Sequence, residues 1–323
     1  MNRIAVLTSG GDAPGMNAAI RAVVRAGVYY KKEVFGVYEG YEGLIHGDFV
    51  KLQVRSVNNI LHRGGTFLKS ARSKAFMTTE GRQQAIEKLK AKNIDGLIVI
   101  GGDGTFTGAV KLSEESDIPT IGIPGTIDND LAGTDYTLGY DTATNTVAHA
   151  IDQIRDTALS HNRLFFIEVM GRNSGAIAVR AGIAGGAVAT LIPEKSMSTE
   201  QLLAKLDKGA KRGKTSSLVV VAEAGDPGRA YKIADAVKDL RPEFDVKVTV
   251  LGHLQRGGSP SCFDRVLASR MGVGAVEGLI NGEKNVMAGI VNDQIVYTSF
   301  ADAIGKSKPV EEEAFRVSKI LSI

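Results

Sequence analysis

Short apolar runs alternate along the chain with segments in which apolar residues recur every three or four positions. The short runs are typical of buried strands and the periodic segments of helices. Strands that alternate with helices usually pair in parallel, so the pattern predicts an α/β fold with mostly parallel sheets flanked by helices. The predicted strands are residues 4–7, 34–38, 97–100, 120–123, 164–170, 188–192, 218–222, 246–251 and 286–291.

The helical period is clear at residues 17–26. Ile20, Val23 and Val24 share one face, whereas Arg21 and Arg25 share the opposite face. The segment is therefore predicted to be an amphipathic helix that packs on a sheet.

Length and composition favour a folded protein of two lobes. The chain has 323 residues, of which 43% are hydrophobic, and a chain of this size usually divides its core between two domains. No Pro- or Ser-rich linker marks the boundary. The 39 basic and 36 acidic residues give a net charge of +3 without long runs of one sign, so we expect no nucleic-acid partner.

The chain shows no targeting or membrane signal. The apolar run 4–7 is too short for a signal-peptide core, and residues 176–193, interrupted by Arg180, fall short of a membrane span. Cys262 is the single cysteine, lies outside the motifs below, and excludes an internal disulfide or a multi-cysteine metal site. We expect a cytoplasmic protein with no membrane partner.

Two Gly-Gly-Asp triplets, residues 10–12 and 101–103, each follow a predicted strand and precede a helical pattern. Ligands of open α/β sheets bind at such strand ends, where glycine lets the backbone approach a phosphate. Taken singly, either loop is as readily a tight turn that binds nothing. The common nucleotide motifs, Walker A and G-x-G-x-x-G, are absent from both.

Acidic residues lie in or beside these strand ends. Asp103 next to phosphate oxygens would be repulsive without a divalent cation, which makes it a candidate Mg²⁺ ligand; the alternative is a helix cap. Asp128 and Asp130 follow the strand 120–123, and Asp128 is a candidate base for an alcohol that receives a phosphoryl group. The alternative there is a turn in which the acids bind local N–H groups.

Several arginines could balance the charge of phosphates. Three of the four candidates follow or lie in turns marked by glycine, and such turns suit bidentate recognition of phosphate. Each arginine taken alone is more often a solvated surface group. The candidates are Arg72, Arg163, Arg172 and Arg256.

Five motifs taken together closely resemble those of the bacterial ATP-dependent 6-phosphofructokinase family, in the same order and spacing over almost the whole chain. Gly-Gly-Asp-Gly-Thr alone is shared with lipid and NAD kinases, whereas the aspartate-rich loop combined with the last motif is specific to phosphofructokinases. The motifs are TSGGDAPGMN at 8–17, GGDGT at 101–105, PGTIDND at 124–130, MGR at 170–172 and GHLQRGG at 252–258.

The resemblance implies the phosphofructokinase fold of two similar lobes, a homotetramer, and a place in glycolysis. The implied reaction transfers the γ-phosphoryl group of ATP, with Mg²⁺, to the C1 hydroxyl of fructose 6-phosphate. Residues 1–139 plus 253–305 would form the ATP-binding lobe, and residues 140–252 plus 306–323 the lobe that binds fructose 6-phosphate.

The family's functional positions are matched residue by residue. Asp128 matches the catalytic base, assisted by Arg72, Thr126 and Asp130. The ATP and Mg²⁺ positions are matched by Gly11, Arg72, Ser73, Gly102, Asp103, Gly104 and Thr105, with Asp103 as the metal ligand. The sugar-phosphate positions are matched by Thr126, Ile127, Asp128, Arg163, Met170, Gly171, Arg172, Glu223, Lys247, His253 and Arg256, with Arg163 acting across a subunit interface.

Two glycines favour ATP as the donor. Relatives that use pyrophosphate carry an acidic residue where Gly104 stands and a lysine where Gly125 stands. Those larger, charged groups would occupy space that the nucleotide needs, so glycine at both positions favours ATP.

Three positions depart from the family pattern. Lys247 replaces the usual arginine of the 6-phosphate site, which keeps the charge but loses the planar fork of donors. Val188 stands where a glutamate usually holds the Mg²⁺ of an allosteric nucleoside diphosphate, and Ser216 where a histidine is frequent. ADP activation is expected to be weakened or absent, although a cationic lining for an anionic effector is matched by Arg21, Arg25, Arg155, Arg212 and Lys214.

Two alternatives stay open at this point. Lys247 leaves room for a kinase with pyrophosphate as donor or another sugar phosphate as acceptor. A catalytically silent sensor that only binds nucleotide or sugar phosphate is disfavoured because Asp103, Asp128 and Arg72 are all present.

Overall fold

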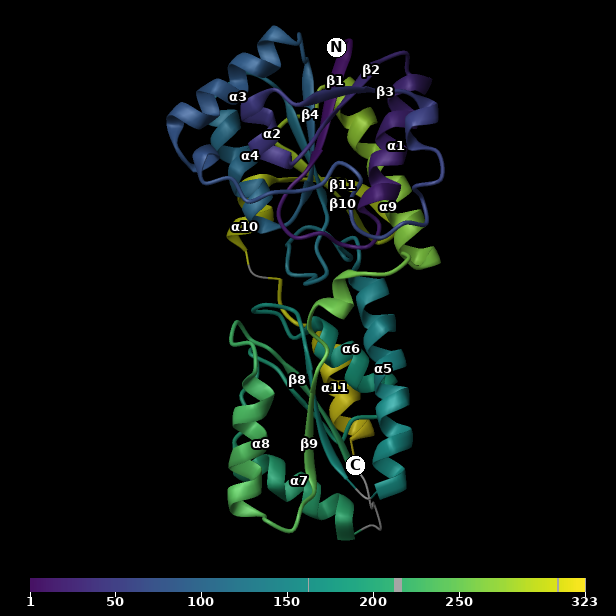
Figure 1. Cartoon of the computed structure of the whole chain (residues 1–323), viewed down its shortest axis with the longest axis vertical. Coiled ribbons are helices and arrows are strands. Elements are labelled where there is room, and N and C mark those ends of the chain that lie inside the picture. The colour runs from purple at the N-terminus through teal and green to yellow at the C-terminus, as the bar shows by residue number, and fades with distance from the viewer. Residues whose placement is uncertain (162, 212–216, 307, 323) are drawn as a thin grey trace. The chain divides into compact units, whose positions relative to one another are not determined.

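The computed structural model describes residues 1–161, 163–211, 217–306 and 308–322. The chain forms two compact units, each with its own sheet and helices (Figure 1). Unit 1 comprises Met1–Ile127, Leu131–Thr142 and Arg256–Ser307, and unit 2 comprises Asp128–Asp130, Ala143–Gln255 and Lys308–Ile323.

Unit 1 is built on a seven-stranded sheet in the order β11-β10-β5-β4-β1-β2-β3. The five inner strands are parallel, and the two edge strands, β3 and β11, are antiparallel to their neighbours. The strands are β1 (Arg3–Thr8), β2 (Glu33–Val37), β3 (Phe49–Leu52), β4 (Gly96–Gly101), β5 (Thr120–Pro124), β10 (Val286–Val291) and β11 (Gln294–Ser299).

Helices cover both faces of this sheet (Figure 1). One face carries α1 (Met16–Tyr29) and α9 (Cys262–Ile280), which pack on each other. The other face carries α2 (Gly40–His46), α3 (Thr79–Ala91), α4 (Asp103–Glu115) and α10 (Phe300–Gly305). Two short 3₁₀ helices, η1 (Val54–Val57) and η2 (Ala75–Met77), lie in the connections.

Unit 2 has a smaller, wholly parallel sheet in the order β7-β8-β6-β9. Its strands are β6 (Leu164–Val169), β7 (Ala189–Leu191), β8 (Ser217–Ala222) and β9 (Val246–Val250). On one face lie α7 (Thr199–Lys211) and α8 (Arg229–Leu240), and on the other α5 (Tyr140–His161), α6 (Ala176–Ala184) and α11 (Glu312–Leu321). The 3₁₀ helix η3 (Gly252–Arg256) follows β9.

The predicted α/β class with mostly parallel sheets is confirmed, and each of the nine predicted strands is present. The predicted helix 17–26 is part of α1, in which Ile20, Val23 and Val24 are fully buried. The sequence pattern missed β3 and β11. Both are antiparallel edge strands with mostly half-exposed residues, so neither carries the continuous apolar run that marks an inner parallel strand.

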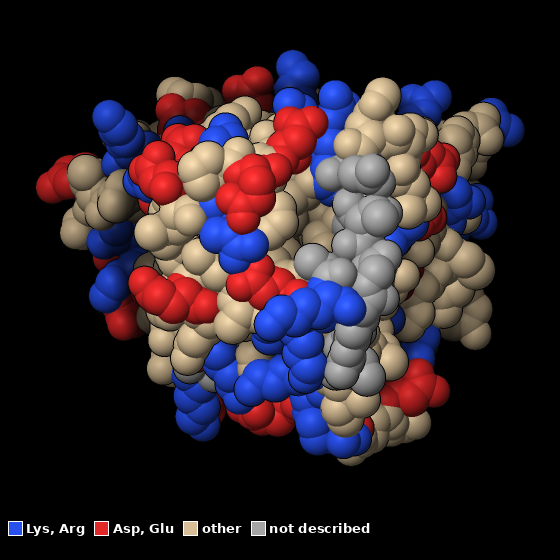
Figure 2. All heavy atoms as spheres, turned by 90° about the horizontal axis from the view of Figure 1, so that it is seen from below, with Lys and Arg blue, Asp and Glu red and all other residues tan. Residues whose placement is uncertain are grey.

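Within the described ranges, no helix combines the length and the apolar character needed to cross a membrane. Figure 2 shows one face of the protein, on which basic and acidic side chains both occur in numbers.

Candidate functional site

The two Gly-Gly-Asp loops lie side by side in unit 1. They follow β1 and β4, which are neighbouring parallel strands with Thr8 opposite Ile100. From β1 the chain continues to β2 on one side, and from β4 it continues to β5 on the other. This reversal is the position at which open α/β sheets form a ligand-binding crevice.

Direct contacts join the two loops. The Ser9 backbone N–H donates to the Ile100 carbonyl at 3.0 Å, and the Thr105 hydroxyl donates to the Ser9 carbonyl at 3.1 Å. A Cβ at Gly101 would lie 2.5 Å from the Ser9 carbonyl oxygen, so only glycine permits this approach.

The second loop leads directly into α4. Gly102 occupies the N-cap position and Asp103 is the first helical residue, so the Asp103 carboxylate does not serve as the N-cap. The first turn of a helix presents unpaired N–H groups and a partial positive charge, which attract anions. A Cβ at Gly104 would meet no atom within 4 Å, so packing within the protein does not require glycine there.

The rear of this loop is fixed to the segment that carries Ser73. The Tyr41 hydroxyl donates to the Thr105 carbonyl at 2.7 Å, and burial raises the pKa of Tyr41, which keeps that hydroxyl protonated. The Tyr41 ring stacks on Phe76 with a centroid distance of 4.0 Å. The Phe76 N–H donates to the Ser73 hydroxyl at 3.0 Å.

The segment that precedes Ser73 is held at the same edge of the sheet. The Ser70 hydroxyl donates to the Gly10 carbonyl at 2.8 Å, and the Thr8 hydroxyl donates to the Lys69 carbonyl at 2.8 Å. Arg72 lies between these anchored residues, with its side chain exposed.

Arg256 reaches the first Gly-Gly-Asp loop. One guanidinium nitrogen, Nη1, donates to the Asp12 carbonyl at 3.2 Å, and it lies 2.6 Å from the point a Cβ of Gly11 would occupy. The positions expected to bind ATP, together with Arg256, therefore gather at one edge of the unit 1 sheet.

The loop after β5 joins this cluster. The Gly125 N–H donates to the Gly101 carbonyl at 2.9 Å, and a Cβ at Gly102 would lie 3.4 Å from Thr126 Cβ. Further along, Asp128 is only 7% exposed, Ile127 is fully buried and Asp130 is half-buried.

In unit 2, the loop that follows β6 contacts both the loop that follows β8 and the 3₁₀ helix η3. The Arg172 N–H donates to Glu223 Oε1 at 3.0 Å, and the Met170 N–H donates to Gln255 Oε1 at 3.1 Å. Gln255 is fully buried and also donates to the Gly252 carbonyl, which ties residues 170–172 to the segment that carries His253. Gly171 and Arg172 both adopt positive φ angles in this turn.

Arg163 and Lys247 lie at the opposite edge of the same sheet. Arg163 directly precedes β6, and Lys247 lies near the start of β9. Asp245 pairs with both, at 2.7 Å from Lys247 Nζ and 2.7 Å from Arg163 Nε, and these contacts lower the pKa of Asp245. The length of β6 separates Arg163 from Met170 by about 20 Å, at about 3.3 Å per residue.

The expected effector residues are divided between the units. Arg21 and Arg25 lie on α1, and burial together with the neighbouring Arg25 lowers the pKa of Arg21. Arg155, on α5, donates to the Gly185 carbonyl. Val188 is a buried member of the unit 2 core, whereas Arg212, Lys214 and Ser216 lie outside the described residues.

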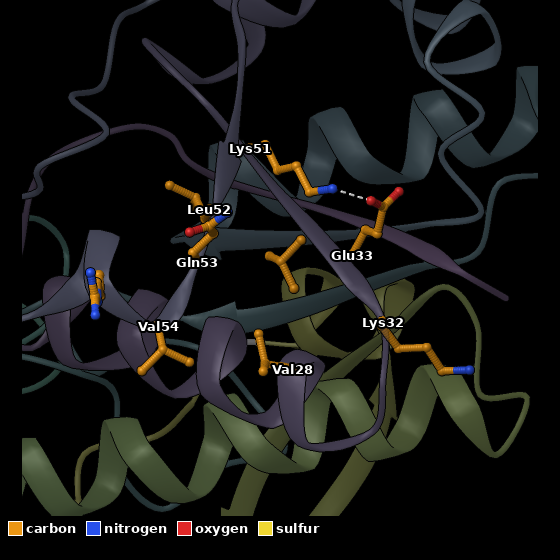
Figure 3. Close-up of a pocket in the computed structure, with 9 residues that line it drawn as sticks. Val28, Lys32, Glu33, Lys51, Leu52, Gln53 and Val54 are labelled. Carbon is orange, nitrogen blue, oxygen red and sulfur yellow. Dashed lines mark hydrogen bonds and ion pairs between the residues drawn. The ribbon is translucent and has the colours of Figure 1, made fainter.

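Unit 1 also has a shallow hollow on its surface (Figure 3). It is bounded by the end of α1, the start of β2, β3 and η1, and its Lys51 and Glu33 form an ion pair. None of the expected catalytic, ATP or sugar-phosphate positions lines it.

Sequence reasoning missed two buried residues that organise the loops, Gln255 and Tyr41. Gln255 lies inside the GHLQRGG motif, and the available signal was its position as a polar residue between His253 and Arg256. Tyr41 gave no comparable signal, because its contact with Thr105 joins residues 64 positions apart.

Fold and loops together define an α/β protein with two glycine-rich loops at the switch point of a parallel sheet. A family model described as Phosphofructokinase matches residues 3–279. The chain belongs to the phosphofructokinase family.

Full-length relatives agree with this family. The chain is 53% identical to the ATP-dependent 6-phosphofructokinase of Cytophaga hutchinsonii over 100% of the chain and 98% of that protein. It is 52% identical to ATP-dependent 6-phosphofructokinase 1 of Thermus thermophilus over the whole length of both.

Solved structures share the fold. A phosphofructokinase from Saccharomyces cerevisiae superposes on the whole chain with a TM-score of 0.89 at 37% identity; the chain spans 48% of that longer protein. A pyrophosphate-dependent phosphofructokinase from Marinobacter aquaeolei superposes with a TM-score of 0.86 at 24% identity. The superposition covers the whole of this chain and 92% of the Marinobacter chain.

Proposed function

We propose that the protein is an ATP-dependent 6-phosphofructokinase of glycolysis. It transfers the γ-phosphoryl group of ATP to the C1 hydroxyl of fructose 6-phosphate and forms fructose 1,6-bisphosphate and ADP. One observation carries the proposal: relatives of this name match the chain from end to end at more than 50% identity. The geometry of unit 1 supports it, because phosphate-binding loops meet where the fold binds ligands.

The donor side of the site is the edge of unit 1 formed by residues 10–12, 72–73 and 102–105. Backbone N–H groups at the start of α4 would hold donor phosphate oxygens. The exposed Arg72 would contact the transferring group and stabilise the charge that develops on it. The open space at Gly104 leaves room for a nucleotide.

Asp103 would hold Mg²⁺. Among the residues that the structure describes, no group of three or more His, Cys, Asp or Glu side chains could enclose a metal ion. Mg²⁺ commonly binds to one or two carboxylates and to substrate phosphates, so a single carboxylate beside phosphate-binding N–H groups fits it. When bound, the ion would neutralise charge on the donor phosphates.

The acceptor would be activated by Asp128. Its buried carboxylate would accept the proton of the C1 hydroxyl, while Thr126 and Asp130 hold the loop and the sugar in place. Most of the rate enhancement would come from positioning and charge stabilisation, as in other phosphoryl transfers.

The sugar-phosphate pocket would need two subunits. Met170, Arg172 and Glu223 gather at the carboxyl edge of the unit 2 sheet, whereas Arg163 and Lys247 lie at its amino edge. Residues about 20 Å apart along β6 do not grip one small sugar phosphate. The two cations would therefore serve the pocket of a neighbouring copy in a homotetramer.

The proposal is tested by measuring the formation of the sugar bisphosphate with ATP and with pyrophosphate as donors. Fructose 6-phosphate and other hexose or heptulose phosphates serve as acceptors. We expect the highest kcat/KM with ATP and fructose 6-phosphate. Higher kcat/KM with pyrophosphate would refute the donor assignment, and tight binding without turnover would indicate a sensor.

The Lys247→Arg variant is expected to lower KM for fructose 6-phosphate by about three- to fivefold, because a guanidinium can hold the 6-phosphate with two parallel hydrogen bonds. Lysine and arginine can both pair with Asp245, so the structure of the enzyme without bound sugar phosphate should change little. Steady-state kinetics with fructose 6-phosphate varied at saturating ATP provide the measurement. Lys247→Gln, which removes the charge, should raise the KM for fructose 6-phosphate. Equal KM values in the wild type and both variants would show that Lys247 does not bind the sugar phosphate.

A further inference from the structure

Asp264 is a fully buried carboxylate outside the positions considered so far. It lies in the first turn of α9, and its own N–H donates to the Ser261 hydroxyl, the N-cap of that helix, at 3.1 Å. Its side chain points to a different helix. Oδ1 accepts from the Gly139 N–H at 2.9 Å, and Oδ2 accepts from the N–H and hydroxyl of Thr142 at 2.8 and 2.5 Å.

These donors belong to the start of α5, which begins at Tyr140. The first N–H groups of a helix lack partners within it, so a carboxylate placed there satisfies them and is favoured by the helix dipole. Burial raises the pKa of Asp264, while the Thr142 and Gly139 contacts oppose that shift. A buried carboxyl group is costly unless hydrogen-bonded, and these donors offset much of that cost.

Ser261 forms a second set of hydrogen bonds between the start of α9 and the start of α5. Its N–H donates to the Thr142 hydroxyl at 2.9 Å, and its own hydroxyl donates to Asp141 Oδ2 at 2.7 Å. The beginnings of α9 and α5 are therefore fixed to each other by polar contacts within unit 1.

The residues just before α5 hold the loop that follows β5. The Leu138 N–H donates to the Pro124 carbonyl at 2.8 Å, and the Thr137 hydroxyl donates to the Thr126 carbonyl at 2.5 Å. Gly125 forms a parallel bridge with Leu138 and donates on its other side to Gly101. The loop thus lies between the Gly101 turn and the segment that Asp264 anchors.

We infer that Asp264 is a positioning residue for phosphoryl transfer, which acts through residues 137–142 to hold Thr126 and the chain that leads into Asp128. The inference rests on the proposed function. Asp264 has no part in the chemistry itself, because its carboxylate oxygens are occupied by the start of α5.

The Asp264→Asn variant tests this role. The asparagine side chain can still accept the hydrogen bond from the Gly139 N–H through its oxygen. Its NH₂ group then faces the N–H and hydroxyl donors of Thr142, so the hydrogen bonds to Thr142 are lost with little change in side-chain size. We expect kcat to fall by about tenfold, since small displacements of reacting groups cost one to two orders of magnitude. KM for ATP should stay within about twofold, because α4 and the Arg72 segment are anchored by other contacts.

Asp95→Asn is the matched control. The Asp95 carboxylate also accepts backbone N–H groups, from Asn2 and Arg3, but at the amino end of β1, away from the loops. We expect the control to lower the midpoint of urea unfolding without changing kcat. An equal loss of kcat in both variants would mean that Asp264 acts only through overall stability, and would overturn the inference.

A pair of Thr142 variants keeps the inference testable if Asp264→Asn does not fold. Thr142→Val removes the hydroxyl that donates to Asp264 and accepts from Ser261, whereas Thr142→Ser retains it. We expect kcat to fall by about threefold in Thr142→Val and to recover in Thr142→Ser. Equal kcat values in the two variants would contradict the anchoring role.

Hydrogen exchange separates this inference from the proposed function. Peptides that cover residues 124–130 and 137–142 should exchange faster in Asp264→Asn than in the wild type, and Asp95→Asn should leave them unchanged. This readout needs no turnover. A wild type without fructose 6-phosphate kinase activity would refute the proposed function alone, whereas unchanged exchange in these peptides would refute the positioning role alone.

Discussion

The Asp128→Ser variant is expected to lower kcat for fructose 6-phosphate phosphorylation by about three orders of magnitude, because a positioned general base contributes roughly 10²- to 10⁴-fold. Serine is small and neutral, so it fits the buried site of an aspartate that is 7% exposed but cannot take up the hydroxyl proton. The measurement is steady-state turnover at saturating ATP and sugar phosphate.

The Asp128→Ser variant should still bind fructose 6-phosphate. The cationic residues expected to hold the sugar phosphate remain in place, so the Kd of fructose 6-phosphate from calorimetry should change by less than about threefold. Asp117→Ser is the matched control, since Asp117 is an exposed acid just before β5. It should retain full kcat. If Asp128→Ser also kept kcat within about twofold of the wild type, Asp128 would not be the base.

The second large effect is expected for Gly104→Asp. The carboxylate would enter the open space at the second residue of α4, next to Asp103 and to the site proposed for the donor phosphates. Repulsion of the negatively charged nucleotide should lower kcat/KM for ATP by about 100-fold, equivalent to about 2.7 kcal/mol. The fold should not suffer, because no atom lies within 4 Å of the added Cβ.

Gly104→Ala separates size from charge. Alanine favours helices over glycine by about 1 kcal/mol, so the thermal midpoint should rise slightly while activity with ATP falls much less than in Gly104→Asp. The measurement compares kcat/KM for ATP and for pyrophosphate in both variants. Unchanged kcat/KM for ATP in Gly104→Asp would show that the donor does not approach the start of α4.

The parallel strands and the position of the glycine-rich loops at the strand ends could be predicted from the sequence because their signals are local. An inner parallel strand is buried on both faces, so β4 and β8 appear as nearly continuous apolar runs. The order and spacing of the motifs also indicated the family, which the full-length relatives confirm. The edge strands β3 and β11 carry no such run and were missed.

The roles of the candidate site residues stay predictions, but the structure decides which of them lie together. The sequence did not determine that β1 and β4 are neighbours, and this pairing brings two loops about 90 residues apart into hydrogen-bond contact. The predicted strand 164–170 already separated Arg163 from Arg172, whereas the pairing of Arg163 with Asp245, 82 positions away, was decided by the tertiary structure.

The sequence by itself determined the class of fold, the family and the loops that could bind phosphate, since apolar runs and glycine-rich turns are set by neighbouring residues. Only the tertiary structure decided the partners of those loops. Asp264 shows why: its contact with Thr142 joins residues 122 positions apart, and the free N–H groups of a helix start that stabilise its carboxylate come together only after the chain has folded.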